Sequence, residues 1–313
     1  MGPIAGIVGP TGSGKTELSL ALAARIPIEI LVADSRQVYR GMDIGTAKPD
    51  GRARDAVPHH LIDLVTPGQA FSVASWADAA RRLVTEVTAR RRLPLVVAGS
   101  GLYLAALLDG YAFGPAPRAE DRARLNHELA TAGVGVLADR LRTVDPSGAA
   151  RTDLRNPRRV ARALERAASR AGTDASALAA KPWEGPISLV GISRPIEVLN
   201  RRIDERAQWL FANGLVEEVR GLLEAGHDPR QAPLTSHGYG EAAHYLAGEW
   251  SLEEAVAVTV RRTRQYAKRQ RTWFRRDERI VWLSAGEAPA DDPTLVAAAE
   301  RVLERLPRAR VEA

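Results

Sequence analysis

The feature that most constrains the fold is a glycine-rich segment near the N-terminus. Residues 9–16 read Gly-Pro-Thr-Gly-Ser-Gly-Lys-Thr and match the pattern G-x-x-x-x-G-K-[ST] at every fixed position. The segment follows an apolar run at 4–8 and precedes a helix-like stretch at 17–25. A chance glycine-rich turn would rarely have both flanks, so the segment predicts a polyphosphate-binding loop between a strand and a helix.

This loop recognises phosphate mainly through its backbone. Its glycines allow several N–H groups to converge on phosphate oxygens, and the following helix adds the positive end of its dipole. Lys15 contributes a positive charge, and the Thr16 hydroxyl can bind Mg²⁺. The candidate phosphate-binding residues are therefore Gly9, Pro10, Thr11, Gly12, Ser13, Gly14, Lys15 and Thr16. An NTPase would normally add an acidic residue from another strand, and no apolar strand here ends in an Asp-Glu pair.

The rest of the chain has the pattern of an α/β protein. Short apolar runs predict buried parallel strands at 4–8, 28–33, 95–98 and 187–192, with a last strand at 280–283. Long helices are predicted at 197–226 and 251–274. We therefore predict a P-loop NTPase-like parallel sheet flanked by helices.

A segment of different character interrupts this pattern. It opens with Pro115 and Pro117, and apolar residues then recur at helical spacing with abundant Arg and Ala and with no candidate strand. We predict an all-helical insertion domain at residues 114–185 and a catalytic core formed by residues 1–113 and 186–313.

Composition excludes several kinds of site and location. The 313 residues include no cysteine, which removes disulfides, thiol nucleophiles and cysteine-bound zinc, and no histidine pair has the spacing of a helical zinc motif. Any metal is then held mostly by oxygen. No signal peptide is readable, and the longest uncharged stretch, 93–108, is shorter than a membrane-spanning helix. We expect a cytoplasmic monomer without membrane contact.

A single carboxylate is the candidate catalytic group. Asp34 follows the apolar run 28–33, which places it at the same edge of the predicted sheet as the phosphate loop. A carboxylate there can accept a proton from a nucleophile or help Thr16 to hold the metal. An Asp at the end of a strand is commonly only a helix cap, but the neighbouring phosphate loop favours the functional interpretation.

The positive charge of the chain is concentrated in one segment. The net charge is +6, and residues 261–279 contain nine basic and two acidic residues, so the remainder sums to −1. On a helix, Arg261, Arg264, Lys268, Arg271 and Arg275 fall on one stripe. Such a stripe is often a solvated face, but without acidic partners it repels itself, so we interpret it as a surface for a nucleic acid backbone.

Other arginines are weaker candidates. Arg158, Arg159 and Arg162 form a second basic cluster, and Arg122 is a further candidate in the same insertion. Arg202 and Arg206 are four residues apart on a predicted helix. They either reach the phosphate ligand or pair with nearby acids such as Asp204 and Glu205.

Several longer motifs resemble those of the bacterial tRNA dimethylallyltransferases, which modify adenosine 37. The resemblance covers nearly the whole chain. Its motifs are Asp-Ser-Arg-Gln-Val-Tyr-Arg-Gly-Met-Asp-Ile-Gly-Thr-Ala-Lys-Pro at 34–49, Pro-His-His-Leu-Ile-Asp at 58–63, Phe-Ser at 71–72, Gly-Ser-Gly-Leu-Tyr at 99–103, Asn-Pro-Arg-Arg-Val-Ala-Arg-Ala-Leu-Glu at 156–165 and Thr-Arg-Gln-Tyr-Ala-Lys-Arg-Gln at 263–270.

The resemblance implies a mechanism. The loop would hold the diphosphate of dimethylallyl diphosphate rather than a nucleotide, which explains the absence of the usual NTPase partner residue. Asp34 would accept a proton from the exocyclic amine of the target adenine as that nitrogen attacks the allylic carbon. Lys15, Thr16 and Mg²⁺ would stabilise the departing diphosphate.

It also implies a tRNA surface, with the adenine flipped out of the anticodon loop into a channel. The matching positions are Asp34, Ser35, Arg36, Gln37, Ser100, Arg122, Arg158, Arg159, Val160, Ala161, Arg162, Thr235, Ser236, His237, Gly238, Tyr239, Gly240, Lys268, Arg269, Gln270, Arg271, Thr272, Trp273, Phe274 and Arg275.

The chain departs from the family pattern at two places. Ser100 replaces a Thr and keeps its hydroxyl. Gly240 and Glu241 stand where an Arg-Gln pair is common, which removes a cation from an expected RNA contact. Three alternatives remain open from the sequence: a transferase acting on free adenine nucleotides, a P-loop small-molecule kinase, and a non-catalytic RNA-binding module.

Overall fold

The computed structural model describes residues 1–69, 71–111, 119–170 and 181–306, so Pro115 and Pro117 lie outside the described residues. The chain forms two compact units. One comprises Met1–Leu108 and Trp183–Ala313, and the other is Asp109–Pro182. These boundaries lie within a few residues of those predicted at 114 and 185. We refer to them as the core unit and the inserted unit.

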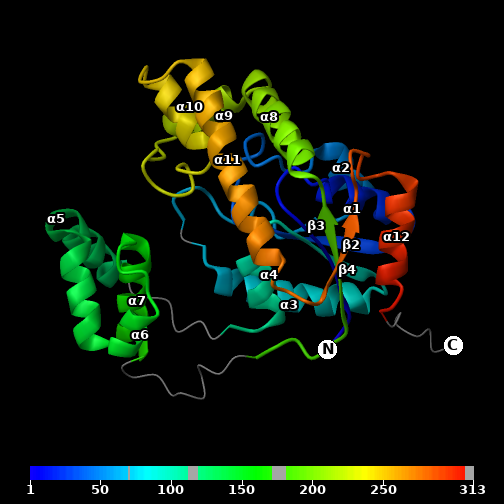
Figure 1. Cartoon of the computed structure of the whole chain (residues 1–313), viewed down its shortest axis with the longest axis horizontal. Helices are drawn as coiled ribbons and strands as arrows, with labels where there is room; N and C mark the ends of the chain where they lie inside the picture. Colours follow the sequence, from blue (N-terminus) through cyan, green and yellow to red (C-terminus); the bar gives the residue numbers. More distant parts are fainter. Residues whose placement is uncertain (70, 112–118, 171–180, 307–313) are drawn as a thin grey trace. The chain divides into compact units, whose positions relative to one another are not determined.

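The core unit is built on a parallel sheet with the order β3-β2-β4-β1-β5-β6 (Figure 1). Its strands are β1 (Ile4–Val8), β2 (Ile28–Ala33), β3 (His59–His60), β4 (Leu93–Ala98), β5 (Ile187–Ser193) and β6 (Ile280–Ser284). All five strand pairs are parallel, as the apolar runs predicted. In the register, Val8 lies opposite Ala98 and Gly191, and Ala33 also lies opposite Ala98. The loops that follow β1, β2, β4 and β5 therefore meet at one edge.

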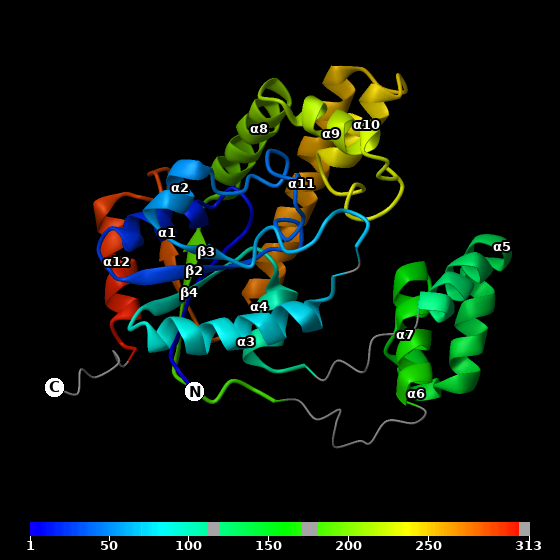
Figure 2. The same ribbon diagram turned by 180° about the vertical axis from the view of Figure 1, so that it is seen from behind.

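Helices cover both faces of this sheet. Alternate strand residues such as Ile30, Leu95 and Val190 pack with α1 (Lys15–Ala23) and α12 (Pro293–Leu303) in one apolar cluster. The opposite face packs on α3 (Val73–Ala89) and α4 (Gly101–Leu108), where the fully buried Trp76 donates its ring N–H to the Val32 carbonyl. Figure 2 shows the two helical layers from behind. The sheet is thus buried on both faces, which explains its near-continuous apolar strands.

The segment after β5 differs from its prediction. A single helix over 197–226 is wrong, because the chain forms α8 (Ile196–Ala212) and α9 (Leu215–Glu224). The break falls at Gly214, whose φ of 100° is left-handed and suits glycine. The helices α10 (Tyr239–Leu246) and α11 (Leu252–Phe274) follow, and α11 packs against α8 and α10 and reaches α4 (Figure 1). The short α2 (Gly51–Ala56) lies between β2 and β3.

The inserted unit has a small core of its own. It contains α5 (Ala119–Val144), α6 (Pro146–Ala150) and α7 (Pro157–Arg170), and no strand among its described residues. Leu137, Leu141 and Val160 are fully buried between these helices. Gly133 interrupts α5 with a left-handed φ of 80°.

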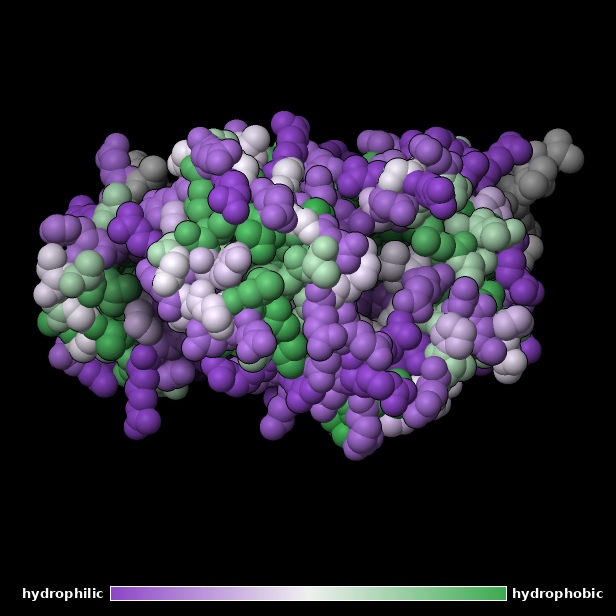
Figure 3. Space-filling view, turned by 90° about the horizontal axis from the view of Figure 1, so that it is seen from above, coloured by the Kyte–Doolittle hydropathy of each residue, from purple (hydrophilic) through white to green (hydrophobic). Residues whose placement is uncertain are grey.

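The length and hydropathy of the helices bear on whether the chain could span a membrane. None of the helices in the described part of the chain is long and apolar enough to cross a bilayer. The face drawn in Figure 3 is largely hydrophilic, with several groups of hydrophobic residues among the hydrophilic ones.

Candidate active site

The glycine-rich loop connects β1 to α1 at the edge where the strand ends meet. Gly12 and Gly14 have left-handed φ values of 79° and 99°, and a Cβ on Gly14 would lie 2.4 Å from the Cβ of Ala290. Lys15 donates from Nζ to the Pro10 carbonyl at 2.8 Å, so its ammonium lies over the loop. Ser13 Oγ is buried and has no hydrogen-bond partner among the described residues. The loop thus has the curled backbone that a phosphate group requires.

Asp34 is oriented by its own turn. Its Oδ1 accepts from the backbone N–H of Arg36 at 2.7 Å and of Gln37 at 3.3 Å, which leaves Oδ2 for other contacts. A Cβ built on Gly99, which follows β4, would lie 3.6 Å from Asp34 Oδ2 and 4.0 Å from Lys15 Cε. The carboxylate that follows β2 and the side-chain stem of Lys15 therefore flank the same small glycine.

These groups line one cavity of about 660 Å³. Its polar wall comes from the loop and α8, and its apolar wall comes from the strands. The lining includes Thr11, Gly12, Gly14, Lys15, Thr16, Asp34, Gln37, Gly99, Arg202, Arg206, Tyr266 and Gln270, together with Ile30, Val32, Val97, Trp209 and His59. A cavity with cations and a carboxylate at one side and aliphatic side chains at the other suits a ligand with a charged head and an apolar tail.

The two arginines of α8 have different surroundings. Arg202 donates to the Gly12 carbonyl at 2.9 Å and pairs with Glu17 at 2.7 Å, so it supports the loop instead of pairing with Asp204 or Glu205. Arg206 lines the cavity and makes no ion pair among the described residues. Burial and the charge of Arg206 lower the pKa of Lys15 to about 8, while Asp34 acts in the opposite direction. An anion in this cavity would find two cations already in place.

Two residues that had no predicted role support the walls of the cavity. Lys48 is buried and pairs with Asp43 and Asp63 at 2.6 Å each, which fixes the segment after Asp34. Glu218 of α9 accepts the backbone N–H groups of Asp43 and Ile44 at 2.9 and 2.7 Å. Lys48 lies in the motif at 34–49, and only this resemblance singled it out. Glu218 is one of several acids on an amphipathic helix and carried no comparable signal.

Arg194 is a further residue that the sequence did not reveal. It follows β5, is 6% exposed, and donates from Nε to the Ser13 carbonyl at 2.9 Å. Its Nη1 donates to the carbonyls of Gly286 and Ala288. A buried arginine therefore holds the back of the glycine-rich loop. Its position directly after an apolar strand is the sequence feature that could have indicated a role at the site.

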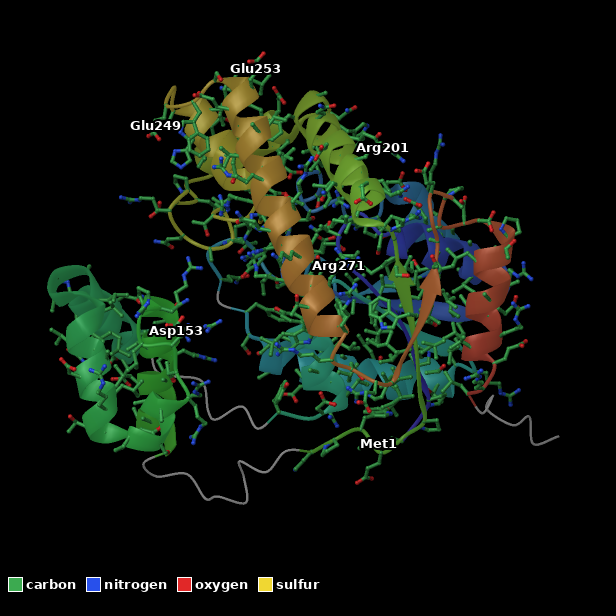
Figure 4. All side chains as sticks on the ribbon, viewed as in Figure 1. Met1, Asp153, Arg201, Glu249, Glu253 and Arg271 are labelled. Carbon is green, nitrogen blue, oxygen red and sulfur yellow. The ribbon has the colours of Figure 1, made fainter. Side chains whose placement is uncertain are left out.

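The basic stripe of α11 is partly neutralised. Arg264 pairs with Asp204, and Arg262 pairs with Glu241, so the premise that the segment lacks acidic partners is wrong for these two residues. Lys268, Arg271 and Arg275 make no ion pair within the described chain. Figure 4 places Glu253 at the beginning of α11 and Arg271 in its last turns. The unpaired positive charge thus gathers at the end of α11 that adjoins α4.

Not every side chain of the expected tRNA surface is accessible. Tyr239, Phe274 and Val160 are at most 1% exposed and belong to the packed interior, and Gln270 is 6% exposed. Contact through these side chains would require a change of conformation. Trp273 is 44% exposed and rests on Gly101, where a Cβ would lie 2.1 Å from its ring.

The departure at Gly240-Glu241 has a structural explanation. Glu241 is fully buried, accepts the Gly238 backbone N–H at 2.7 Å, and pairs with Arg262. Its carboxylate therefore supports the start of α10. Nearby, the His237 ring lies 5.6 Å from that of Tyr266, and burial with the charges of Arg262, Arg269 and Arg36 lowers the pKa of His237 to about 4.

The inserted unit carries its own basic surface. Glu165 of α7 is 8% exposed and accepts from Arg122 at 3.1 Å and from Arg162 at 2.7 Å, so one acid orients two arginines. Arg158 is exposed and has no ion pair among the described residues, and Arg159 lies 3.8 Å from Asp153, which Figure 4 labels.

The donor set for a metal is small. The described residues contain no group of three or more His, Asp or Glu able to hold a metal. Thr16 and Asp34 both line the cavity, and each carries a side-chain oxygen. One hydroxyl and one carboxylate fit Mg²⁺, which usually keeps several waters and binds through substrate phosphates.

Fold and site together define a P-loop protein in which a carboxylate at the end of β2, Asp34, shares a cavity with a phosphate-binding loop, as in enzymes that transfer a group from a phosphate ester. Residues 37–277 match the family model described as IPP transferase. The chain belongs to the IPP transferase family.

Curated relatives agree with this assignment. The chain is 44% identical to a tRNA dimethylallyltransferase of Roseiflexus castenholzii, over 96% of this chain and 97% of the relative. It is 45% identical to that of Moorella thermoacetica, over 90% of this chain and 89% of the relative. The resemblance stated from the motifs is thereby confirmed.

Solved structures confirm the fold. The full-length tRNA isopentenylpyrophosphate transferase of Bacillus halodurans is 36% identical, with a TM-score of 0.71 and 97% of each chain covered. A eukaryotic dimethylallyltransferase crystallised while acting on tRNA is 22% identical, with a TM-score of 0.77, over all of this chain and 82% of that one. The latter likeness concerns the fold.

Proposed function

We propose that this protein is a tRNA dimethylallyltransferase that moves a dimethylallyl group from dimethylallyl diphosphate to N6 of adenosine 37. The observation that carries the proposal is the cavity in which Asp34 Oδ2 and Lys15 flank Gly99. It offers a base on one side and a diphosphate site on the other. The names of the relatives at 44–45% identity support the same reaction.

The residues divide the chemistry between them. The glycine-rich loop, Lys15 and Arg206 bind the diphosphate, while Arg202 keeps the loop in shape. The adenine N6 attacks the allylic carbon, the bond from that carbon to the diphosphate oxygen breaks, and Asp34 accepts the N6 proton. Cations around the leaving oxygen stabilise the charge that develops there. The aliphatic wall formed by Ile30, Val32 and Val97 accommodates the dimethylallyl group.

Mg²⁺ fits this site. Thr16 would hold it through its hydroxyl, and Asp34 would hold it through a bound water, which keeps Asp34 Oδ2 able to accept the N6 proton; diphosphate oxygens and water would fill the remaining positions. The ion supplies charge neutralisation of the leaving diphosphate.

The tRNA contacts follow from the accessible basic residues. Lys268, Arg271 and Arg275 at the end of α11, with Arg158 and Arg162 in the inserted unit, would bind the phosphates of an anticodon stem-loop. Arg36, Ser100 and His237 would face the flipped nucleotide. The protein acts as a monomer in this proposal.

A labelling experiment tests the proposal. The protein is incubated with labelled dimethylallyl diphosphate, Mg²⁺ and either unmodified tRNA or AMP. We expect label on adenosine 37 of the tRNA and none on AMP. Label on AMP alone would indicate a free-nucleotide transferase. Phosphoryl transfer from ATP without an allylic substrate would indicate a kinase.

A further inference from the structure

One residue of the expected tRNA surface has its side chain turned into the protein. Gln270 lies in α11 between Arg269 and Arg271 and is 6% exposed. Its Oε1 accepts the backbone N–H of Thr11 at 2.9 Å, and its Nε2 donates to the Gly99 carbonyl at 2.7 Å. Both amide atoms therefore have backbone partners, and the side chain also interacts with Tyr266, so the protein itself fixes the position of this amide.

The two partners of Gln270 belong to the centre of the proposed site. Thr11 lies in the glycine-rich loop after β1, and Gly99 follows β4, the neighbouring strand. A Cβ on Gly99 would lie 3.5 Å from Gln270 Nε2 and 3.6 Å from Asp34 Oδ2. One side chain thus holds the ends of two adjacent strands at the place where the diphosphate and the base must be aligned.

The contact also limits which loop amides can bind phosphate. The Thr11 N–H already has a side-chain acceptor, so this donor is directed at α11. Without the amide of Gln270, a loop N–H and a strand-end carbonyl would lose their partners in a poorly solvated place, which favours rearrangement of the loop.

We propose that Gln270 is a positioning residue for the diphosphate-binding loop and not a tRNA contact. The inference rests on the proposed function for its substrate. Its physical basis is the pair of hydrogen bonds that link α11, whose neighbouring residues carry the unpaired charges, to Thr11 and Gly99. Catalytic alignment depends on displacements of well under an ångström, so loss of this link should impair the diphosphate site first.

The test compares Gln270→Met, which keeps the shape without the amide, with Gln208→Met. Gln208 is exposed on α8 and does not line the cavity, so it is the matched control. Binding of dimethylallyl diphosphate is measured by calorimetry without RNA, and binding of an anticodon stem-loop is measured separately. For Gln270→Met we expect the Kd and the KM for dimethylallyl diphosphate to rise about tenfold. The stem-loop Kd should stay within about twofold, and the control should change neither.

A second variant and a second measurement distinguish a local effect on the loop from misfolding of the whole protein. Gln270→Asn keeps an amide but is one methylene too short to span both partners, so it should show the same rise in KM. Hydrogen exchange of the peptide containing Thr11 should accelerate in both variants. A normal diphosphate Kd together with weakened stem-loop binding, as expected for Arg271→Ala, would overturn the proposal. Failure of the unaltered protein to label tRNA would instead count against the proposed function.

Discussion

At the scale of single residues, Asp34 combines a fixed and a free carboxylate oxygen. Oδ1 is held by the N–H groups of Arg36 and Gln37, and Oδ2 lies near Gly99, which lines the same cavity as Asp34. Asn can preserve the turn through its carbonyl oxygen, but its amide cannot accept a proton from the adenine. The substitution Asp34→Asn therefore separates the structural role of the residue from its catalytic role.

We expect Asp34→Asn to reduce prenyl transfer by about 10² or more while stem-loop binding changes by less than about twofold. Asp50→Asn provides the control, because Asp50 caps α2 through the Ala53 N–H and Asn caps equally well. Single-turnover transfer and stem-loop binding are the measurements. Unchanged transfer in Asp34→Asn would remove Asp34 from the catalytic assignment.

Lys15 makes the binding of diphosphate sensitive to pH. Burial and Arg206 lower its pKa to about 8. The lysine is charged below that pH and loses its charge above it, and only the charged form attracts diphosphate. We expect kcat/KM for dimethylallyl diphosphate, which reports the free enzyme, to fall as the pH rises above about 8. A profile that stays flat from pH 7 to 10 would show that Lys15 remains protonated or does not contribute.

At the scale of elements, Glu241 stabilises the junction between α10 and α11. It is fully buried and joins the Gly238 N–H to the guanidinium of Arg262. Glu241→Gln keeps an acceptor for the N–H but leaves Arg262 without a counter-charge. We expect the free energy of unfolding to fall by about 2 kcal/mol.

The matched substitution is Glu249→Gln, which removes an exposed pair with His244 and should cost less than about 0.5 kcal/mol. Urea denaturation of both variants measures the difference. If both variants lost the same free energy of unfolding, the burial of Glu241 would not add to the stability that its ion pair provides.

The end of α11 should dominate the dependence of tRNA binding on salt. Arg271→Ala removes a charge with no ion pair in the described chain, so the slope of log K against log salt should flatten by about 0.7 to 0.9. Arg301→Ala removes an exposed arginine of α12, which packs on the other face of the sheet, and should leave the slope unchanged. Substitution of Arg264 should change the salt dependence less than its place in the stripe suggested, because Asp204 already neutralises its charge.

The sequence predicted those elements whose signal is local. The glycine-rich loop and the five predicted strands each depend on adjacent residues, and all are present, whereas the two-residue strand β3 carried no such signal. Other features depend on residues far away in the chain. They are the direction in which Gln270 points, the partners of Arg202 and the burial of Glu241. A helical stripe shows which residues share a face but not which of them find an acid on a neighbouring helix.

At the scale of the whole molecule, the two chain segments that connect the units run side by side. The Trp183 N–H donates to the Leu108 carbonyl at 2.7 Å, and Lys181 to that of Gly110 at 3.0 Å, so the chain leaves and re-enters the core unit by adjacent connections. A short glycine-containing turn from Leu108 to Trp183 should therefore close the core unit without the insertion.

We expect that variant, which lacks residues 109–182, to fold and to bind dimethylallyl diphosphate with nearly unchanged affinity. Its affinity for the anticodon stem-loop should fall at least tenfold, because Arg158 and Arg162 are removed. Calorimetry with each ligand measures the two effects. Stem-loop binding as tight as that of the intact protein would exclude a role of the inserted unit in tRNA recognition.

The order of the strands also has a consequence for synthesis on the ribosome. β1 pairs with β4 on one side and β5 on the other, so a nascent chain that ends in the inserted unit still presents β1 as an open edge. The inserted unit packs its own core and can close first. Arg194, Arg202 and Gln270, which hold the glycine-rich loop, all emerge later. An incomplete chain therefore contains the loop motif but lacks the residues that shape it, and it should sequester no prenyl donor before translation has finished.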